Sequence, residues 1–389
     1  MSNLRIGVIG CGGRGNVAGF ALQSKAGARI VAGCSDYEPH LEAFKEKYGD
    51  DVYTCVDYQD IISRDDVDAV FITTPDFLHE EMAIAALEAG KPVYLEKPLA
   101  ISIEGCDRIL KAAYKTKTKL FLGHNMRHFE SVLKMKEIID SGQIGEIQAV
   151  WCRHFIDYGG DAYFKDWHSE KQYANSLLLQ KGAHDIDVIH WLAGSYTERV
   201  VGMGKLSVYD QCARRHESER GDASFRDENW PPLEQTKCSP KIDIEDHNMI
   251  MMQLRNGIQC SYLQCHYTPD TCRNYTFIGT KGRLENIGDT GNRQIYVYTD
   301  RHSSFGTPNQ IFQLFGQDQA HGGADPNIVD EFIRFVKFND LTNTSPLAAR
   351  NSVATGVLGA ASLREGNVPK VIPELDPALV DYFENNQQW

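Results

Sequence analysis

LRIGVIGCGGRG, residues 4–15, is the stretch of sequence that decides the fold. A strand-length apolar run ends in a cluster of glycines, and a helical pattern follows to about Ser24. Gly10, Gly12 and Gly15 have the G-x-G-x-x-G spacing, in which they permit a tight turn, a close approach of a pyrophosphate and close helix packing, respectively. The pattern of strand, glycine turn and helix predicts a dinucleotide site, with a tight turn that binds no nucleotide as the alternative.

A second part of this dinucleotide signature follows the next apolar run. Asp36 lies just after the expected strand Arg29–Cys34, 21 residues beyond Gly15. An acid at this position accepts hydrogen bonds from the adenosine ribose and repels a 2′-phosphate. We therefore expect NAD rather than NADP, although Arg14 and Ser35 leave room for NADP.

Strand and helix patterns alternate through the first third of the chain, which predicts a parallel sheet covered by helices on both faces. The expected strands are Leu4–Ile9, Arg29–Cys34, Ala69–Thr73, Pro92–Leu95 and Leu120–Gly123, and the expected helices after the first are His40–Tyr48, Glu80–Ala89 and Ser102–Thr116. We assign residues 1–124 to a dinucleotide-binding Rossmann domain of the α/β class.

The pattern then changes to strands joined by turn signals, after one more helix at Phe129–Ser141. The expected strands are Ile147–Ile156, Arg199–Tyr209, Asn248–Leu254, Gln259–His266, Asn274–Gly279 and Gln294–Tyr298. Residues 125–389 are predicted to form an α+β domain with an open, mainly antiparallel sheet, for substrate binding and oligomerisation. A polar stretch without periodicity, residues 211–241, is expected to be a long loop inserted in this sheet.

Composition excludes several classes of protein. A net charge of -13 over 389 residues disfavours nucleic acid and anionic membranes as partners. No apolar segment approaches the roughly 18 residues of a membrane span, and the N-terminal segment lacks the pattern of a signal peptide. The ten cysteines are interpreted as reduced thiols, which together with these features predicts a cytoplasmic protein.

Three further segments carry a family resemblance: Glu96-Lys97-Pro98, Gly123-His124-Asn125-Met126-Arg127 and Lys181-Gly182-Ala183-His184-Asp185-Ile186-Asp187. With the glycine signature, they resemble the glucose-fructose oxidoreductase / inositol dehydrogenase / rhizopine-catabolism (Gfo/Idh/MocA) family over nearly the whole chain. The resemblance implies a Rossmann domain followed by an open-faced mixed sheet, with the substrate between them. It also implies that the lysine of the Glu-Lys-Pro segment contacts the reacting hydroxyl.

Lys97 is the first catalytic candidate. It follows an expected parallel strand at its carboxyl end, where open α/β sheets bind ligands. A lysine near a carbinol oxygen can hydrogen-bond it, lower its pKa and help relay its proton. Pro98 follows directly, and an X-Pro bond can be cis at modest cost. The alternative is a surface lysine beside a turn.

His184 is the second catalytic candidate, because an imidazole can accept a proton near neutral pH. It opens an expected helix, residues 182–192, on which Lys181, His184 and Asp187 share a face. Asp187 would orient the histidine and Lys181 would bind a substrate oxygen. Gln180 stands where inositol dehydrogenases often have an aspartate, so the usual Asp-His pair is in doubt and a buried structural histidine is the alternative. For His190, outside this face, we favour that structural role.

The remaining candidates rest on position or resemblance. Asn125 is expected to face the nicotinamide or the substrate, and Arg127 to brace the domain junction. The resemblance adds a set of cofactor contacts: Gly13, Arg14, Thr73, Pro75, His79, Glu96 and Lys97. Trp167 and His168, with Tyr158 and His266, could line a sugar cleft. No metal site is expected, because Cys260, Cys265, His266 and Cys272 form no C-x-x-C pair and strand alternation separates Cys265 from His266.

These features together favour an NAD-dependent oxidoreductase that transfers a hydride to or from a hydroxyl carbon of a sugar, glycoside or cyclitol. One alternative is a glycosidase that uses bound NAD for transient oxidation followed by elimination. Another is a sugar sensor without catalytic activity. The outer face of an open sheet needs cover, so a homodimer or homotetramer is expected.

Overall fold

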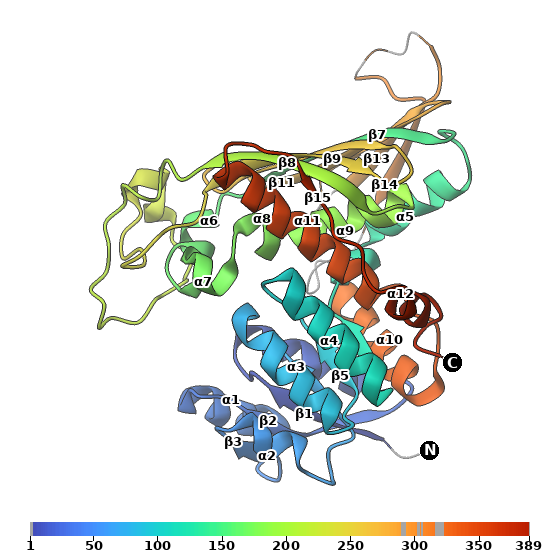
Figure 1. The fold of residues 1–389 in the computed structure, drawn as a ribbon. Coiled ribbons are helices and arrows are strands. Elements are labelled where there is room, and N and C mark those ends of the chain that lie inside the picture. The colour runs from blue at the N-terminus through green and yellow to red at the C-terminus, as the bar shows by residue number, and fades with distance from the viewer. Residues whose placement is uncertain (1–2, 289–292, 302–303, 305, 316–322, 389) are drawn as a thin grey trace. The chain divides into compact units, whose positions relative to one another are not determined.

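The computed structural model describes residues 3–288, 293–301, 304, 306–315 and 323–388 (Figure 1). The chain divides into two compact units. The first comprises Met1–Phe129, Gln319–Arg350 and Glu374–Trp389, and the second comprises Glu130–Asp318 and Asn351–Pro373.

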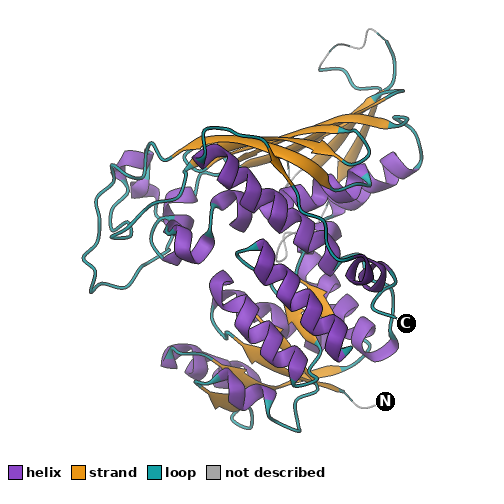
Figure 2. Ribbon diagram, in the orientation of Figure 1, coloured by secondary structure: helices purple, strands orange, loops and turns teal. Residues whose placement is uncertain are grey.

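A six-stranded parallel sheet forms the centre of the first unit (Figure 2). Its strands are β1 (Leu4–Ile9), β2 (Ala28–Cys34), β3 (Tyr53–Cys55), β4 (Ala69–Ile72), β5 (Val93–Leu95) and β6 (Leu120–Leu122), in the order β3-β2-β1-β4-β5-β6. This is the order of two mononucleotide-binding halves, whose switch point lies between β1 and β4. The Rossmann fold predicted from the sequence is therefore confirmed.

Helices cover the strands of this sheet. They are α1 (Glu38–Tyr48), α2 (Tyr58–Ile62), α3 (His79–Glu88), α4 (Ile103–Thr116), α10 (Ala324–Phe338) and α12 (Pro377–Glu384), with short turns η2 (Asp76–Leu78) and η3 (Asn125–His128). Every residue of β4 and β5 is buried, as expected for parallel strands covered on both faces. The first expected helix, η1 (Gly13–Gln23), consists of 3₁₀ turns, and its three glycines reduce the preference for an α-helix.

The hydrophobic core of the first unit joins distant parts of the chain. Phe332 of α10 packs edge-on against Phe71 of β4, with ring centroids 5.2 Å apart, and against Tyr94 of β5. α10 also packs against η1. Residues 324–338 thus complete the Rossmann core although they come late in the chain, while the predicted domain division after residue 124 stays a prediction.

A nine-stranded sheet forms the centre of the second unit. Its strands are β7 (Ile147–Phe155), β8 (Thr197–Lys205), β9 (His247–Leu254), β10 (Gln259–Cys265), β11 (Cys272–Gly279), β12 (Arg283–Ile287), β13 (Arg293–Tyr298), β14 (Gln310–Leu314) and β15 (Lys370–Val371), in the order β14-β13-β12-β11-β7-β10-β9-β8-β15. Only β7 and β10, among these described strands, pair in parallel. The expected open, mainly antiparallel sheet is confirmed.

One face of this sheet carries helices. α9 (Gly182–Ala193) packs on β7 and β10, and α5 (Glu130–Asp140) packs on β12 and β13. α6 (Gly159–Tyr163), α7 (Lys171–Ala174), α8 (Leu177–Gln180) and α11 (Pro346–Arg364), most of which belongs to this unit, complete the helices. Ile250 and Met252 of β9 are buried, whereas Met249 and Met251, which point to the opposite face, are exposed.

Residues 206–246, which we call the insertion, connect β8 to β9. Lys205 and His247 are paired neighbours at the ends of these strands, so a short turn would suffice to join them. The insertion contains the predicted 211–241 loop, with two 3₁₀ turns, η5 (Asp227–Asn229) and η6 (Pro232–Glu234). The strand expected to reach Tyr209 ends at Lys205, because the Asp246 carboxylate accepts the N–H groups of residues 207–209.

Two general features concern the described residues only. None of their helices is long and apolar enough to cross a membrane. All ten cysteines lie within the described ranges, and none of them forms a disulfide.

Candidate functional site

The glycine turn after β1 has a backbone that only glycine fits. Gly10 has a φ of 94°, and a Cβ there would lie 2.9 Å from the backbone of Thr73 and Thr74. A Cβ at Gly15 would lie 2.3 Å from the carbonyl oxygen of Gly10. Thr73, a predicted cofactor contact, donates its hydroxyl to the Gly10 carbonyl at 2.7 Å. These contacts fix the turn at the switch point of the sheet.

The outer side of this turn is open. Nothing lies within 4 Å of a Cβ built on Gly13, and at Gly12 the three nearest atoms all belong to the His40 ring. Asp36 is exposed just beyond the carboxyl end of β2, and the neighbouring Ser35 hydroxyl lies 3.2 Å from Nδ1 of His40. Open backbone at the start of η1 suits a pyrophosphate, and an exposed acid after β2 suits ribose hydroxyls. The residues present therefore fit NAD.

Arg14 lies at the centre of a charged cluster in the first unit. Its Nε donates to Glu96 at 2.6 Å, and its two terminal nitrogens donate to Asp325 at 2.7 and 3.0 Å. Asn125 donates to the same Asp325 carboxylate at 2.9 Å. Burial opposes the charge of Arg14, but Glu96 and then Asp325 raise its pKa above the ordinary value. The sequence identified Arg14, Glu96 and Asn125, but not Asp325, which lies on α10.

Lys97 lies on a closely held turn after β5. The Lys97–Pro98 peptide bond is cis, and the Lys97 backbone N–H donates to Glu96 at 3.2 Å. His79 is fully buried, with Nδ1 2.7 Å from the carbonyl oxygen of Pro98 and Nε2 3.0 Å from that of Thr74. His79 therefore joins the Lys97 turn to the segment after β4, which includes the half-buried Pro75. Lys97 itself is half-buried.

Lys181 stands at the start of α9 in the second unit. Its Nζ donates to the Tyr158 hydroxyl at 3.2 Å and lies 5.7 Å from the centre of that ring. Burial works against its charge, but the Tyr163 and Tyr158 hydroxyls outweigh burial and raise the pKa of Lys181 above the ordinary value. Lys181 therefore carries a positive charge beside two aromatic rings. His184, one helical turn further on, is half-buried.

Asp185, rather than Asp187, is the hub of hydrogen bonds on α9. It is completely buried and accepts from His154 Nδ1 at 3.0 Å, from the Tyr262 hydroxyl at 2.9 Å and from the Tyr275 hydroxyl. Arg273 Nε forms an ion pair with it at 2.7 Å. Four groups from β7, β10 and β11 therefore hold the helix residue that follows His184.

The charges of this Asp185 cluster follow from burial and from one arginine. Burial would raise the pKa of Asp185, but Arg273 and then His154 lower it well below the ordinary range. Burial and the Arg273 charge lower the pKa of His154 to about 3. Burial, and then the Asp185 charge, raise the pKa values of Tyr262 and Tyr275 well above the ordinary value. The cluster is thus a carboxylate–guanidinium pair surrounded by neutral donors.

The remaining predicted residues have diverse surroundings. Asp187 is buried, and its predicted role in orienting His184 stays a prediction. Trp167 and His168 stack 3.7 Å apart, and His168 Nδ1 lies 2.6 Å from Asp166. His190 is buried and accepts from the Thr197 backbone N–H at 3.1 Å, and its structural role stays a prediction.

Two further observations complete the site residues. Arg127 donates to the carbonyl oxygen of Asn343 within the first unit. Within the described ranges, no group of three or more histidine, cysteine or acidic residues is placed to hold a metal ion.

Sequence reasoning missed Asp185 and its partners for a physical reason. The helical spacing from His184 pointed to Asp187, whereas the strands of the sheet determine which acid receives hydrogen bonds. A weak signal existed: His154 and Arg273 occupy the same alternating positions as the buried apolar residues Val150, Cys152 and Phe277 of their strands. A buried charge on a strand requires a partner, and an acid on the covering helix supplies it.

Comparison with known proteins gives matches over most of the chain. The family model described as "Oxidoreductase family, NAD-binding Rossmann fold" (GFO_IDH_MocA) matches residues 4–124. The model described as "Oxidoreductase family, C-terminal alpha/beta domain" matches residues 136–371.

Similar sequences include two inositol 2-dehydrogenases. That of Klebsiella pneumoniae (strain 342) is 36% identical over 192 residues, which are 49% of this chain and 54% of the relative, so the chain spans about half of that relative. That of Burkholderia multivorans (strain ATCC 17616 / 249) is 35% identical over 262 residues, which are 66% of this chain and 70% of the relative. Among solved structures, a levoglucosan dehydrogenase in complex with NADH and levoglucosan has a TM-score of 0.78 at 19% identity, and the match covers 96% of this chain and all of that one. The structural similarity concerns the fold.

Proposed function

Because the chain belongs to the GFO_IDH_MocA oxidoreductase family, we propose that it transfers a hydride between NAD and a hydroxyl carbon of a sugar, glycoside or cyclitol. The family, the fold class and the NAD(P)-dependent dehydrogenase or reductase class expected from the sequence are confirmed. The inositol 2-dehydrogenases among its relatives support a polyhydroxylated ring as the substrate.

The Lys97 turn is the observation that carries this proposal. His79 and Glu96 hold it at the carboxyl end of β5, the edge at which a parallel sheet binds ligands. When bound, the nicotinamide accepts or donates the hydride. The Lys97 ammonium donates a hydrogen bond to the reacting oxygen and stabilises its developing alkoxide character. A lysine whose backbone is held in this way is suited to the role, because its turn needs little reorganisation during the reaction.

Residues of α9 complete the proposed chemistry. His184 accepts or relays the hydroxyl proton, and Asp187 orients it. Lys181, which is charged and held by Tyr158, binds a neighbouring substrate oxygen. Asn125, Trp167 and His168 are proposed as further substrate contacts.

NAD is the proposed cofactor, in preference to NADP. Asp36 is exposed where a 2′-phosphate would meet a negative charge. Arg14, the nearby cation that could favour NADP, is engaged by Glu96 and Asp325. We propose that the cofactor contacts are Gly10, Gly12, Gly13, Arg14, Gly15, Asp36, Thr73, Pro75, His79, Glu96 and Lys97, with Arg14 acting through Glu96. Residues 1–124 would then bind the dinucleotide.

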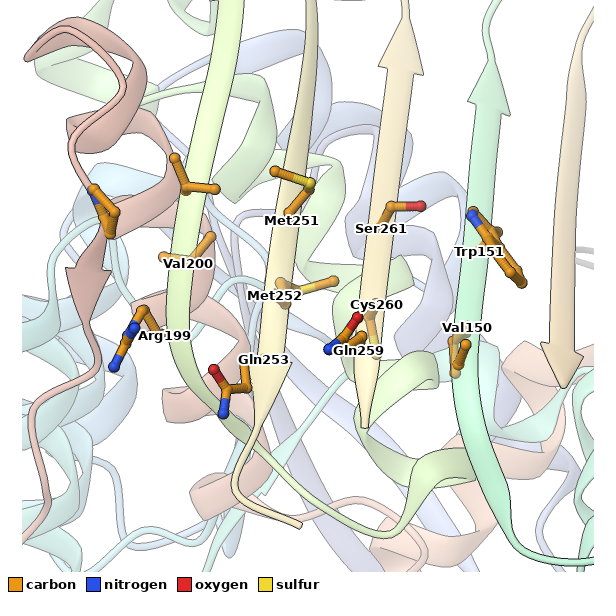
Figure 3. Close-up of a pocket in the computed structure, with 13 residues that line it drawn as sticks. Val150, Trp151, Arg199, Val200, Met251, Met252, Gln253, Gln259, Cys260 and Ser261 are labelled. Carbon is orange, nitrogen blue, oxygen red and sulfur yellow. The ribbon is translucent and has the colours of Figure 1, made fainter. Parts of the chain in front are cut away.

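A homodimer or homotetramer is proposed from the uncovered face of the second sheet. Val201, Met251, Ser261 and Trp151 are aligned across four neighbouring strands. Figure 3 shows the last three of these on adjacent strands around a shallow hollow. Met251 is 64% exposed and Trp151 is 49% exposed, which is unusual for such large apolar side chains in a row. A second copy of the chain would cover them, within residues 125–389.

The glycosidase remains the second candidate, since it would use the same Lys97 and the same NAD. It requires in addition an acid that protonates the leaving group. A sugar sensor is a third candidate, and the presence of both Lys97 and His184 argues against it. We propose a cytoplasmic location, as expected from the sequence.

A screen of sugars, glycosides and inositols for NADH formation tests the proposal. In Lys97→Ala, kcat should fall by about 10²-fold or more while NAD still binds, since acid–base assistance has that magnitude. His184→Ala should behave similarly and alter the pH–rate profile, whereas Lys181→Ala should act mainly on KM. Near wild-type turnover in both the Lys97 and the His184 variant would refute the assignment, and release of an aglycone without NADH would favour the glycosidase.

A further inference from the structure

The insertion is docked onto the short helix α6 and the residues after it. The Ser239 backbone N–H donates to the carbonyl oxygen of Phe164 at 2.8 Å, and Asn229 donates to Asp161 at 2.6 Å. The backbones of Gly221 and Lys165 are so close that a Cβ on Gly221 would lie 2.1 Å from the Lys165 carbonyl oxygen. The insertion therefore has a defined position against α6 and the residues that follow it.

A small hydrophobic core fixes the same position. Tyr209, Cys212, Cys238 and Ile244 of the insertion are buried against Tyr163, Phe164 and Leu177. Figure 1 shows the insertion beside α6 and α7 at one end of the sheet. A long segment that the sheet does not need, but that is packed in this way, usually serves a function.

One aromatic side chain of the insertion stays exposed. Phe225 is 67% exposed, yet its ring lies edge-on to the ring of Tyr158, with centroids 5.5 Å apart and planes at 77°. The hydroxyl of Tyr158 accepts the hydrogen bond from Lys181. Tyr158 therefore contacts both Phe225 and the Lys181 ammonium, which we propose to bind a substrate oxygen.

We propose that Phe225 and Tyr158 form the wall of a second subsite, which binds the ring attached to the reacting sugar. The substrates would then be glycosides rather than free monosaccharides or inositols. This inference rests on the proposed function, because Lys181 marks the position of the reacting sugar. It goes further by assigning the insertion to substrate selection.

The chemistry of the wall fits such a ring. Pyranoses present an apolar C–H face and aglycones are often aromatic, and both stack on exposed aromatic side chains. The Phe225 ring offers an apolar surface on which a ligand ring can stack. The Lys181 ammonium, on the other side of Tyr158, can donate a hydrogen bond to a substrate hydroxyl. A stacking contact that is equally strong in the ground and transition states affects KM and leaves kcat unchanged, so binding affinity is the direct readout of the wall.

The test compares matched pairs of ligands. Glucose, galactose and N-acetylglucosamine, each with its 4-nitrophenyl β-glycoside, and myo-inositol are titrated calorimetrically into the NADH-loaded protein. We expect the wild type to bind at least one glycoside more tightly than its parent sugar. Phe225→Ala should weaken binding of that glycoside about five- to tenfold, within the range of a lost aromatic pair, and binding of the parent sugar by less than about twofold.

Two variants serve as controls. Phe225→Tyr keeps the ring and should bind the glycoside as the wild type does. Leu233→Ala removes another exposed apolar side chain of the insertion and should change nothing. Equal losses for glycoside and parent sugar in Phe225→Ala, or no loss, would overturn the inference, as would a wild type that prefers no glycoside.

Turnover separates this inference from the proposed function. If sugars yield NADH but no glycoside is preferred, only the second subsite is refuted. If glycosides bind in a Phe225-dependent manner but no compound yields NADH, the subsite stands and the proposed hydride transfer fails.

Discussion

Each unit of the molecule contains an arginine held by buried carboxylates, but the two clusters differ in their access to water. In the first unit, the Arg14 side chain is 29% exposed and has two acidic partners, Glu96 and Asp325. In the second unit, Arg273 is 9% exposed, and Asp185, its partner, is completely buried. The Arg14 guanidinium is therefore partly hydrated and paired with two acids, whereas the Arg273–Asp185 ion pair is excluded from solvent.

This difference determines what each cluster can tolerate. A buried charge that loses its partner keeps the full cost of its desolvation, whereas a partly hydrated charge does not. The Asp185 cluster should therefore be a rigid support under α9, which carries Lys181 and His184. The Arg14 cluster should stabilise the Glu96–Lys97 turn less strongly.

The same substitution in the two clusters gives the largest expected effect. Asp185→Asn removes the negative charge that pairs with buried Arg273 at 2.7 Å and should lower the free energy of unfolding by about 3–5 kcal/mol. Asp325→Asn leaves Arg14 paired with Glu96 and should cost only about 1–2 kcal/mol. Urea unfolding followed by hydrogen-exchange mass spectrometry measures both, because it reports on peptides of each unit separately.

The result is informative in either direction. Asp166→Asn, which removes the partner of half-buried His168, is a control in the second unit that should cost less than about 1 kcal/mol. Equal losses of unfolding free energy for Asp185→Asn and Asp325→Asn would contradict the distinction between the buried Asp185 cluster and the partly hydrated Arg14 cluster.

The two clusters also differ in how far the sequence predicts them. Arg14 and Glu96 belong to contiguous motifs, a glycine turn and a Glu-Lys-Pro segment, whose spacing is set by local backbone geometry. Asp325, 311 residues beyond Arg14, lies on a helix that no local pattern connects to the Rossmann core. Here the sequence identifies one half of the ion pair.

In the second unit, the sequence predicts the strands but not their register. His154, Arg273 and Gln264 are direct neighbours on three strands, and this register brings the first two to Asp185. A pattern of alternating residues predicts which face a side chain occupies, but not which strand lies beside it. The helix predicted over residues 182–192 is observed as Gly182–Ala193, and Gly194, in the left-handed conformation, ends it.

Mild acid should also lower the free energy of unfolding through the Asp185 cluster, by a smaller amount than Asp185→Asn. The folded pKa of His154 is about 3, below the roughly 6.5 of an unfolded histidine, so the unfolded state binds more protons between these values. Stability must therefore fall as the pH decreases from about 6.5. This one group should cost about 2 kcal/mol between pH 7 and pH 5. Asp185 adds little between pH 7 and pH 5, because its pKa is lowered in the folded state and is only about 3.9 in the unfolded state, so the carboxyl is ionised in both.

His154→Gln isolates that contribution. The variant should lose about 2 kcal/mol of the difference in unfolding free energy between pH 7 and pH 5, measured by urea titration at both values. His216→Gln, at an exposed histidine of the insertion, should leave the difference unchanged. If His154→Gln were as sensitive to acid as the wild type, the histidine would be hydrated or charged in the folded protein. The Asp185 cluster would then not be excluded from water.

Asp36 extends the comparison to a carboxylate in full contact with water. It is exposed beyond β2, so its removal should leave the free energy of unfolding unchanged within about 0.5 kcal/mol. Its effect should instead lie in the choice of cofactor, because one unit charge near a 2′-phosphate is worth about tenfold in discrimination. Asp36→Ala should lower the ratio of kcat/KM with NAD to that with NADP by about this factor, mainly by improving kcat/KM with NADP. Asp60→Ala, at an exposed acid of α2, is the matched control and should keep the wild-type ratio. A wild type that prefers NADP would refute the role of Asp36. An unchanged ratio in Asp36→Ala would instead attribute the preference for NAD to the pairing of Arg14 with Glu96 and Asp325. The Arg14 cluster, rather than the exposed acid, would then determine the choice of cofactor.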